Sequence, residues 1–233
     1  MHITYEGSEL VAPNIQTFFF RAETKPDYVA GQFIEITLPH KHVDQRGQKR
    51  WFTLSSSPSE ELLAITTKCA GPSSTFKQTL FGLMPGVSVM ISEPMGDFVL
   101  PKDNQLPLLF VAGGLGITPV RSMVKWLCDN NDRRDVTIIY RVSNKDDIAF
   151  IDLFESYGVK PKTILSQQTS DWPGIKGPLT ADTILSLLPN IQEALIYVSG
   201  PELMVERLEE ELKFKKIRPD KLVLDFFPGY PAI

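Results

Sequence analysis

A glycine-rich turn is the part of the sequence with the clearest chemical use. The segment Ala112-Gly113-Gly114-Leu115-Gly116-Ile117-Thr118-Pro119 follows a short apolar run and opens an amphipathic one. Glycines allow a backbone turn to approach a ligand closely, and the sequence predicts Thr118 as the N-cap of a helix with Pro119 at its first position. Because a helix N-terminus favours anions, the turn indicates a site for a nucleotide pyrophosphate; a tight turn without a ligand is the alternative.

A second turn of the same kind lies later in the chain. The segment Val198-Ser199-Gly200-Pro201-Glu202 again joins an apolar run to an amphipathic one. In a doubly wound parallel sheet, ligands bind at the carboxyl ends of the strands where the strand order reverses. Two glycine turns at that edge would flank one crevice, so the pair indicates a nucleotide site more strongly than either turn alone.

A third cluster combines a guanidinium, aromatic rings and hydroxyls in Arg50-Trp51-Phe52-Thr53-Leu54-Ser55-Ser56-Ser57-Pro58. Arginine suits bidentate phosphate binding, and Ser and Thr hydroxyls can donate or accept a hydrogen bond. Taken alone, the segment is better explained as a strand with an exposed arginine and a serine turn. It becomes a candidate binding wall only together with the two glycine turns.

The chain has two halves with different sequence patterns, which meet near residues 101–107. The elements of these two halves must position the clusters. The first half has short runs of β-forming residues separated by Pro, Gly and Ser, with one helical pattern over Ser74–Leu80. This spacing predicts a closed antiparallel barrel over residues 1–102. Its predicted strands are Thr17–Arg21, Phe33–Leu38, Trp51–Leu54, Leu62–Lys68 and Val87–Ser92.

The second half alternates apolar runs with amphipathic ones, which predicts a doubly wound parallel α/β sheet over residues 103–233. The predicted strands are Leu108–Ala112, Val136–Tyr140, Thr163–Leu165, Leu195–Val198 and Leu222–Leu224. The predicted helices are Val120–Cys128, Ile148–Tyr157, Thr180–Leu188 and Glu202–Lys215.

Charge and composition exclude several classes of function. The 24 Lys and Arg against 28 Asp and Glu give a net charge of -4, so no general basic field exists to bind nucleic acid or anionic lipid. The uncharged stretch Leu106–Val120 is shorter than the roughly 20 residues that span a bilayer. The first residues lack the basic and apolar regions of a signal peptide, and we expect a cytoplasmic protein without membrane insertion.

Metal-based redox chemistry is not indicated either. Cys69 and Cys128 are far apart, which excludes an all-cysteine iron–sulfur cluster supplied by this chain alone, and both are interpreted as buried small hydrophobic residues. His40 and His42 could chelate a metal together with Asp44. A solvated loop is the better interpretation, because no second pair of ligands is spaced to complete a site.

The three clusters, in this order, resemble the ferredoxin–NADP reductase superfamily across nearly the whole chain. Smaller matches are Ala30-Gly31-Gln32-Phe33, Ser74-Thr75-Phe76-Lys77, Pro94-x-Gly96-x-Phe98 and Phe227-Pro228-Gly229-Tyr230. The resemblance implies a flavin-binding antiparallel barrel followed by a domain that binds a pyridine nucleotide. It further implies that electrons pass from nicotinamide to flavin and then onward, with the cofactors supplying the reactivity and the protein their orientation.

The resemblance also implies roles for individual residues. Arg50 would hold a flavin phosphate together with Ser74 and Thr75, Phe52 would lie against the flavin, and Phe227 would cover it. Thr53, Ser199 and Phe227 are the residues expected at the point of hydride transfer. The full set expected to bind cofactors is Arg50, Phe52, Thr53, Leu54, Ser55, Thr67, Lys68, Ser74, Thr75, Gly113, Gly114, Gly116, Thr118, Pro119, Gly200, Pro201 and Phe227.

Three departures from the superfamily's pattern bear on function. Phe52 stands where Tyr is usual, and the lost hydroxyl corresponds to about 1 kcal/mol of flavin affinity. Ser199 replaces the usual Cys beside the nicotinamide. After the third parallel strand the chain reads Leu165-Ser166-Gln167-Gln168, without the arginine that often binds the 2′-phosphate of NADPH, so NADH is favoured. Arg141 or Lys145 could restore NADPH binding.

These features predict an NAD(P)H-dependent flavin oxidoreductase that carries FAD, with FMN as the alternative. It would pass electrons to a separate acceptor such as a ferredoxin-like or oxygenase-type protein. A free-flavin or ferric reductase, in which the flavin is a diffusing substrate, is the second hypothesis and follows from Phe52. A flavin- or nucleotide-binding regulatory subunit without turnover is the third and follows from Ser199.

Overall fold

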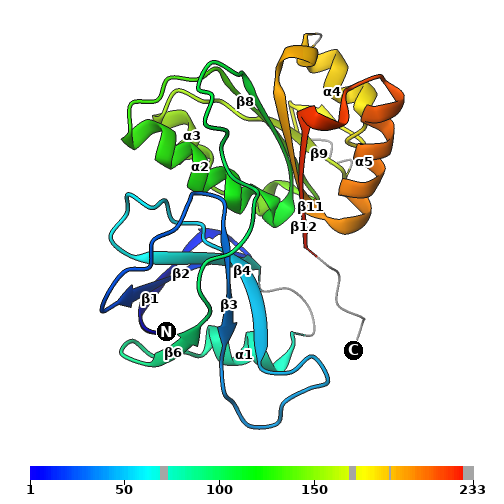
Figure 1. The fold of residues 1–233 in the computed structure, drawn as a ribbon. Helices are drawn as coiled ribbons and strands as arrows, with labels where there is room; N and C mark the ends of the chain where they lie inside the picture. The colour runs from blue at the N-terminus through cyan, green and yellow to red at the C-terminus, as the bar shows by residue number, and fades with distance from the viewer. Residues whose placement is uncertain (69–72, 168–171, 189, 228–233) are drawn as a thin grey trace.

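The computed structural model describes residues 1–68, 73–167, 172–188 and 190–227. Within them the chain forms an antiparallel six-stranded sheet followed by a parallel six-stranded sheet, each with its own apolar core. Figure 1 shows the two parts stacked one above the other, with α2 lying at their junction. The predicted fold class is confirmed, whereas the boundary between residues 102 and 103 stays a prediction.

The antiparallel sheet has the strand order β4-β3-β6-β1-β2-β5. Its strands are β1 (His2–Ala12), β2 (Ile15–Ala22), β3 (Phe33–Thr37), β4 (Lys49–Thr53), β5 (Leu63–Lys68) and β6 (Ser88–Ile91), and helix α1 (Thr75–Phe81) lies between β5 and β6. Alternate side chains of the strands point inward, as in β2, where Phe18 and Phe20 are fully buried. Phe18 packs edge-on against Phe81 of α1, so the helix closes one end of this core.

The antiparallel sheet curls like a barrel without closing along its length. Its outermost strands, β4 and β5, approach each other at one end through a bridge between Leu54 and Ile65, where the Ser55 N–H donates to the Ala64 carbonyl at 2.8 Å. The prediction of a closed barrel is therefore corrected to a partly open one. Continuous pairing is absent between the described residues of β4 and β5, because the chain leaves β4 at Thr53 toward the second sheet.

The parallel sheet has the order β10-β9-β8-β7-β11-β12, so the strand order reverses at β7. Its strands are β7 (Leu108–Gly113), β8 (Val136–Val142), β9 (Lys162–Leu165), β10 (Ile175–Lys176), β11 (Leu195–Pro201) and β12 (Leu222–Phe227). Its helices are α2 (Ile117–Asp129), α3 (Ile151–Ser156), α4 (Ala181–Leu187) and α5 (Glu202–Phe214), with 3₁₀ turns η1 (Gly114–Gly116), η2 (Lys145–Asp147), η3 (Ile191–Glu193) and η4 (Pro219–Lys221). Figure 1 shows α2 and α3 on one face of this sheet and α4 and α5 on the other. Separate apolar clusters fill the two faces.

Most predicted elements lie within a few residues of the observed ones. The strands β1 and β10 were not predicted, because Gly7, Ser8 and Glu9 interrupt the apolar pattern of β1 and β10 has only two residues. The prediction for the start of α2 was wrong. The η1 turn runs directly into α2, so Gly116 is the N-cap, Pro119 is the third helical residue, and the Thr118 hydroxyl donates back to the Leu115 carbonyl at 2.8 Å.

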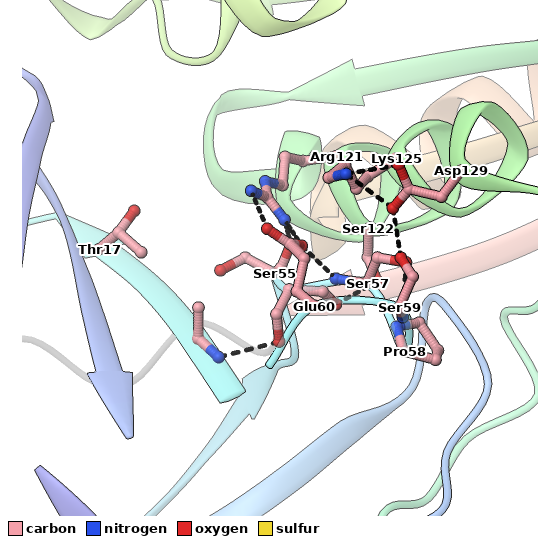
Figure 2. A network of polar contacts seen from close by, with 12 residues as sticks. Thr17, Ser55, Ser57, Pro58, Ser59, Glu60, Arg121, Ser122, Lys125 and Asp129 are labelled. Atoms are coloured by element: carbon pink, nitrogen blue, oxygen red, sulfur yellow. Dashed lines mark hydrogen bonds and ion pairs between the residues drawn. The ribbon is translucent and has the colours of Figure 1, made fainter. Parts of the chain in front are cut away.

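A network of polar contacts along α2 joins the two sheets (Figure 2). The Arg121 guanidinium pairs with the Glu60 carboxylate and donates to the Ser55 carbonyl at 2.9 Å. The Ser122 hydroxyl donates to the Ser56 carbonyl at 2.6 Å, and the Ser59 hydroxyl donates to the Asp129 carboxylate. The contacts of Arg121 and Ser122 are partly or fully buried, which holds the two halves in one arrangement, and the Ser59 contact is exposed.

Two properties of the described residues bear on the type of protein. No helix among them is long and apolar enough to cross a membrane. They also contain no group of three His, Cys, Asp or Glu side chains placed to hold a metal ion. Cys128 is half-buried rather than buried, and Cys69 lies outside the described residues.

Candidate functional site

A cleft of about 450 Å³ lies where the two sheets meet. Its walls are Arg46, Arg50, Trp51, Phe52, Thr53, Thr66, Thr67, Ser73, Ser74 and Lys77 from the antiparallel part, and Gly113, Gly114, Leu115, Thr118, Pro201 and Phe227 from the parallel part. Its described lining residues include three cationic side chains and no carboxylate. The size is in the range of small-molecule sites, and the charge favours an anionic ligand.

Arg50 provides the most constrained cation of the cleft. Its side chain is only 6% exposed, and its Nη1 donates to the carbonyl oxygens of Arg46 at 2.5 Å and Lys49 at 2.6 Å. The guanidinium also lies over the ring of Phe76, 5.1 Å from the ring centroid. These contacts fix the guanidinium before any ligand binds, so little side-chain entropy remains to be lost on binding.

Aromatic and hydroxyl side chains continue the same wall. Phe52 stacks on Phe76 of α1 with ring centroids 5.9 Å apart, and Thr53 is buried at the end of β4. The hydroxyl of Thr66 donates to Ser55 and bonds Thr17, so Thr66 lines the cleft but points its hydroxyl into the antiparallel sheet. A planar, largely apolar ligand suits this wall between the aromatic rings and Thr53.

The glycine turn forms the opposite wall, and its glycines serve two purposes. Gly114 has φ +53 and open space around the position of a Cβ, which is the conformation and exposure that a ligand-facing turn requires. A Cβ on Gly116 would lie 2.0 Å from the carbonyl oxygen of Ser199. Gly116 therefore allows η1 to pack against β11, while Gly114 faces the cleft.

The carboxyl ends of β11 and β12 bring together Ser199 and Asp225. The two residues are register partners, and the Ser199 hydroxyl donates to Asp225 Oδ2 at 3.0 Å. Burial raises the pKa of the Asp225 carboxyl, the Ser199 hydroxyl opposes that shift, and nearby Asp97 adds to it. A carboxyl at the edge of a cleft with such a shift is typical of functional sites.

A second hollow of about 280 Å³ adjoins the cleft and shares Trp51, Phe52, Thr53 and Phe227 with it. Its other lining residues are Phe33, Leu224, Asp225 and Phe226. Phe227, the last described residue of β12, thus stands between the two hollows. Residues 228–230 of the predicted terminal motif, and Gln168, lie outside the described residues.

The structure brings many, but not all, of the predicted site residues to the cleft. Those that line it are Arg50, Phe52, Thr53, Thr67, Ser74, Gly113, Gly114, Thr118, Pro201 and Phe227. Leu54 lies in the core of the antiparallel sheet, and Ser55 lies under α2. Pro119 is buried in α2, whereas Gly116, Ser199 and Gly200 pack behind the glycine turn.

The other two residues of the predicted set support their neighbours. Lys68 forms an ion pair with Asp147 at 2.5 Å, which joins the antiparallel part to the parallel part. The Thr75 hydroxyl bonds His40 and the backbone of Asp44. Both residues therefore hold the walls of the cleft in place, and neither is among its described lining residues.

Sequence reasoning missed seven residues of the two hollows that bear on chemistry. They are Arg46, Trp51, Thr66, Ser73, Lys77, Leu115 and Asp225. Asp225 carried a usable signal, because it is the single charged residue in the apolar run Leu222–Phe227. Arg46 carried none, since only the fold of the loop before β4 brings it to the cleft.

The residues present fit a flavin on one wall and a dinucleotide on the other. The cationic and hydroxyl side chains suit phosphates, the aromatic wall suits a planar ring system, and the Gly114 turn leaves room for close approach of a ligand. The cleft also lies at the carboxyl ends of β7 and β11, where the order of the parallel sheet reverses. This is the expected place for a nucleotide in such a sheet.

Comparison with protein families gives one match, the oxidoreductase NAD-binding domain, over residues 110–210. The matched segment contains both glycine turns. Residues 110–210 of the chain are thus similar to that domain, and they lie within the half predicted to bind the pyridine nucleotide. The superfamily resemblance expected from the motifs is therefore confirmed.

Two curated relatives illustrate the similarity. Flavohemoprotein A of Dictyostelium discoideum is 29% identical over 217 residues, which cover 85% of this chain and 53% of that protein. NADH oxidoreductase HCR of Escherichia coli is 26% identical over 213 residues, which cover 91% of this chain and 62% of that protein. The chain thus spans about half to two thirds of the length of these relatives.

Two solved structures show the same fold as this chain. The cytochrome P450 reductase GcoB of Amycolatopsis has a TM-score of 0.86 at 20% identity, with 98% of this chain and 70% of that chain covered. The flavohem-like FAD/NAD-binding domain of nitric oxide dioxygenase from Vibrio cholerae has a TM-score of 0.85 at 18% identity, with 98% of both chains covered. The chain therefore shares its two-part fold with these structures along nearly its whole length.

Proposed function

We propose that this chain is an NAD(P)H-dependent flavin oxidoreductase that transfers a hydride from a nicotinamide to a flavin and passes the electrons to a separate acceptor. One observation carries the proposal. The cationic and aromatic wall that includes Arg50 and Phe52 faces the Gly114 turn across a single cleft. A flavin and a reduced nicotinamide that are bound to these two walls would share that cleft.

FAD is the proposed flavin, and it supplies an acceptor for the hydride that can release electrons singly or in pairs. Arg50, supported by Ser74, would bind its phosphate, and Phe52 and Thr53 would line the ring system. Phe227 would cover the exposed ring face until a nicotinamide displaces it. Similar solved structures include an FAD/NAD-binding domain and a flavohemoglobin with bound FAD, which supports this choice over FMN.

The protein's own contribution is positioning and exclusion of water. The backbone of Gly113 and Gly114 would approach the pyridine nucleotide. Pro201, in the second glycine turn, would contact the nucleotide from the other side. Ser199 and Asp225 hold each other at 3.0 Å behind this position. We propose that the pair orients the nicotinamide, because the Asp225 carboxyl fixes the direction of the Ser199 hydroxyl.

NADH is the proposed donor. Ser166 and Gln167 follow β9, and neither carries the charge that would bind a 2′-phosphate. The names of similar proteins do not decide the donor, since one is an NADH and another an NADPH oxidoreductase. We expect kcat/KM to be about tenfold higher for NADH; equal values would indicate that Arg141 or Lys145 binds the additional phosphate.

The proposed acceptor is a haem or oxygenase protein. Similar curated proteins include flavohemoproteins and the reductase subunits of stachydrine N-demethylase and glycine betaine monooxygenase. One similar structure is a ferredoxin reductase of carbazole 1,9a-dioxygenase. These names support an acceptor that receives electrons from a flavin, and they leave its identity to experiment.

A titration of the purified protein tests the proposal. The protein reconstituted with FAD is expected to show a flavin spectrum that NADH bleaches under anaerobic conditions and that an artificial acceptor restores over many turnovers. Absence of stoichiometric flavin, together with no oxidation of either reduced nicotinamide, would refute the proposal. Bleaching without repeated turnover would instead favour the regulatory-subunit hypothesis.

A free-flavin reductase is the second candidate, and the ring of Phe52 favours it. Phe52 stacks on Phe76 and offers no hydroxyl to a flavin, so the bound flavin would lose one hydrogen bond. Gel filtration separates the candidates. Flavin that co-elutes with the protein indicates a resident cofactor, whereas colourless protein that reduces added riboflavin or FMN indicates a diffusing substrate.

A further inference from the structure

The loop between β3 and β4 determines where the cations of the cleft lie. Arg46 of this loop lines the cleft, and the carbonyl oxygens of Arg46 and Gly47 accept hydrogen bonds from Arg50 Nη1 at 2.5 and 3.2 Å. The loop therefore contributes one cation and holds another. Any residue that fixes the loop will also set the position of both guanidinium groups.

Asp44 fixes the turn that precedes Arg50. Its Oδ1 accepts the Arg46 N–H at 2.9 Å, and its carbonyl accepts the Gly47 N–H at 3.0 Å. Its Oδ2 accepts the backbone N–H of Thr75, at the start of α1, at 2.8 Å. The Thr75 hydrogen bond lowers the pKa of Asp44, so the carboxylate remains a strong acceptor.

His40 completes the contact between this loop and α1. Its Nδ1 lies 2.7 Å from the Leu38 carbonyl and its Nε2 lies 2.9 Å from Thr75 Oγ1. A carbonyl only accepts, so Nδ1 carries the proton. In the neutral imidazole with its proton on Nδ1, Nε2 accepts the proton of the Thr75 hydroxyl, while Thr75 Oγ1 accepts the Asp44 N–H at 3.1 Å. We call His40, Thr75 and Asp44 the loop clip.

We propose that His40 is a positioning residue for phosphate recognition: through the loop clip it fixes Arg46 and Arg50, and the site thereby distinguishes phosphorylated flavins from riboflavin. The inference rests on the proposed function, since it assumes that the cleft binds a flavin. His40 is not among the described residues that line the cleft, so it would act only through Thr75 and Asp44.

His42 provides a matched control within the same loop. Its side chain is exposed and forms no hydrogen bond to another described residue. Its φ of 56° is in the left-handed region, which Asn tolerates well. His42→Asn therefore removes an imidazole two residues from His40 without touching the loop clip.

Three variants test the proposal by their affinities for FMN and riboflavin, measured by quenching of flavin fluorescence. His40→Asn keeps a nitrogen near the position of Nδ1 but has no atom at Nε2, so it breaks the link to Thr75. We expect its Kd for FMN to rise about tenfold, with the Kd for riboflavin within about twofold of the wild type. His40→Gln, which has an atom near Nε2, is expected to recover most of the FMN affinity, and His42→Asn to match the wild type.

The outcomes separate this inference from the proposed function. Wild-type FMN affinity in His40→Asn, or equal losses for FMN and riboflavin, would overturn the role of His40 while the flavin site itself stands. A wild-type protein that binds neither compound would overturn the proposed function and the inference together. If His40→Asn does not fold, Thr75→Ser, which keeps the hydroxyl, and Thr75→Val, which lacks it, make the same comparison: only the Val variant should lose FMN selectivity.

Discussion

At the scale of single residues, the cleft depends on charges that are held before a ligand arrives. Arg50 is almost completely buried, and its guanidinium is fixed by backbone carbonyls and by the ring of Phe76. Lys49, its neighbour in β4, is instead 62% exposed and pairs with Glu35 on the outer face of the sheet. Side chains alternate along a strand, and of these two adjacent cations only Arg50 is among the described residues that line the cleft.

This alternation leads to a test of Arg50 against Lys49. Arg50→Ala is expected to weaken flavin binding by about 2 kcal/mol, or roughly thirtyfold in Kd, because a charge-assisted hydrogen bond to a phosphate is lost. Lys49→Ala should change the Kd by less than about twofold. Isothermal titration of FAD measures both. Equal affinities of the two variants would show that Arg50 does not contact the ligand.

Asp225 gives a prediction about pH and stability. Its pKa is raised in the folded protein by burial, so the folded state binds the proton more tightly than the unfolded chain. The stabilising effect of that proton is complete below the unfolded pKa of about 3.9 and is lost as the pH rises through the folded pKa.

Asp225→Asn removes this titration and retains an oxygen that accepts the Ser199 hydroxyl. The variant is therefore expected to have a higher Tm than the wild type at pH 7 and the same Tm near pH 3.5. Thermal unfolding followed by circular dichroism across this range measures the difference. A Tm gap that grows as the pH falls would contradict the direction of the pKa shift.

At the scale of elements, the η1 turn and α2 carry the nucleotide-binding side of the cleft. Gly116 lets η1 pack against the Ser199 carbonyl, and the Thr118 hydroxyl closes the turn on Leu115. Gly114 has a left-handed backbone conformation, and no atom lies near the position of its absent Cβ. The turn is thus rigid on its inner side and accessible on its outer side.

Gly114→Val tests this arrangement. A β-branched residue at φ +53 is strained and would also block the approach of a nucleotide to the backbone. We expect the KM for NADH to rise at least about tenfold with little change in the Kd for flavin. Gly158→Val is the matched control, because Gly158 has φ +78, equally open surroundings and a place after α3. A rise in KM in both variants would point to backbone strain alone.

At the scale of the whole molecule, two separately packed cores must keep their cleft aligned. Arg121 and Glu60, with side chains that are 13% and 26% exposed, form a largely buried ion pair between the two parts. Arg121 also donates to the Ser55 carbonyl, directly after β4. Loss of this contact would let one wall of the cleft shift relative to the other.

Arg121→Met is expected to destabilise the protein by about 2 kcal/mol, because Glu60 is left without its partner. It should lower kcat more than it raises the Kd for flavin, since a flavin would bind to the antiparallel part alone. Arg21→Met removes an exposed pair within the first sheet and should change neither quantity appreciably. Stopped-flow reduction by NADH measures the rate, and urea unfolding measures the free energy of unfolding. An unchanged reduction rate in Arg121→Met would show that this pair does not align the cleft.

The sequence by itself determined the kinds of elements and the two turns of the site. Local patterns sufficed, because alternation of apolar residues specifies strands, and the glycines of residues 113–116 and 199–201 mark turns whose geometry few other residues adopt. The motif order then gave the resemblance to the ferredoxin–NADP reductase superfamily. It also gave ten of the residues that line the cleft, since these lie within or beside the motifs.

Only the tertiary structure decided what the neighbouring polar groups do. Ser55 and Ser56 look like ligand hydroxyls in sequence, yet the fold places them under α2, where their carbonyls accept from Arg121 and Ser122. The register of β11 and β12 pairs Ser199 with Asp225. Such contacts join residues far apart in the chain, and their partners depend on strand register and helix placement, which local sequence patterns do not encode.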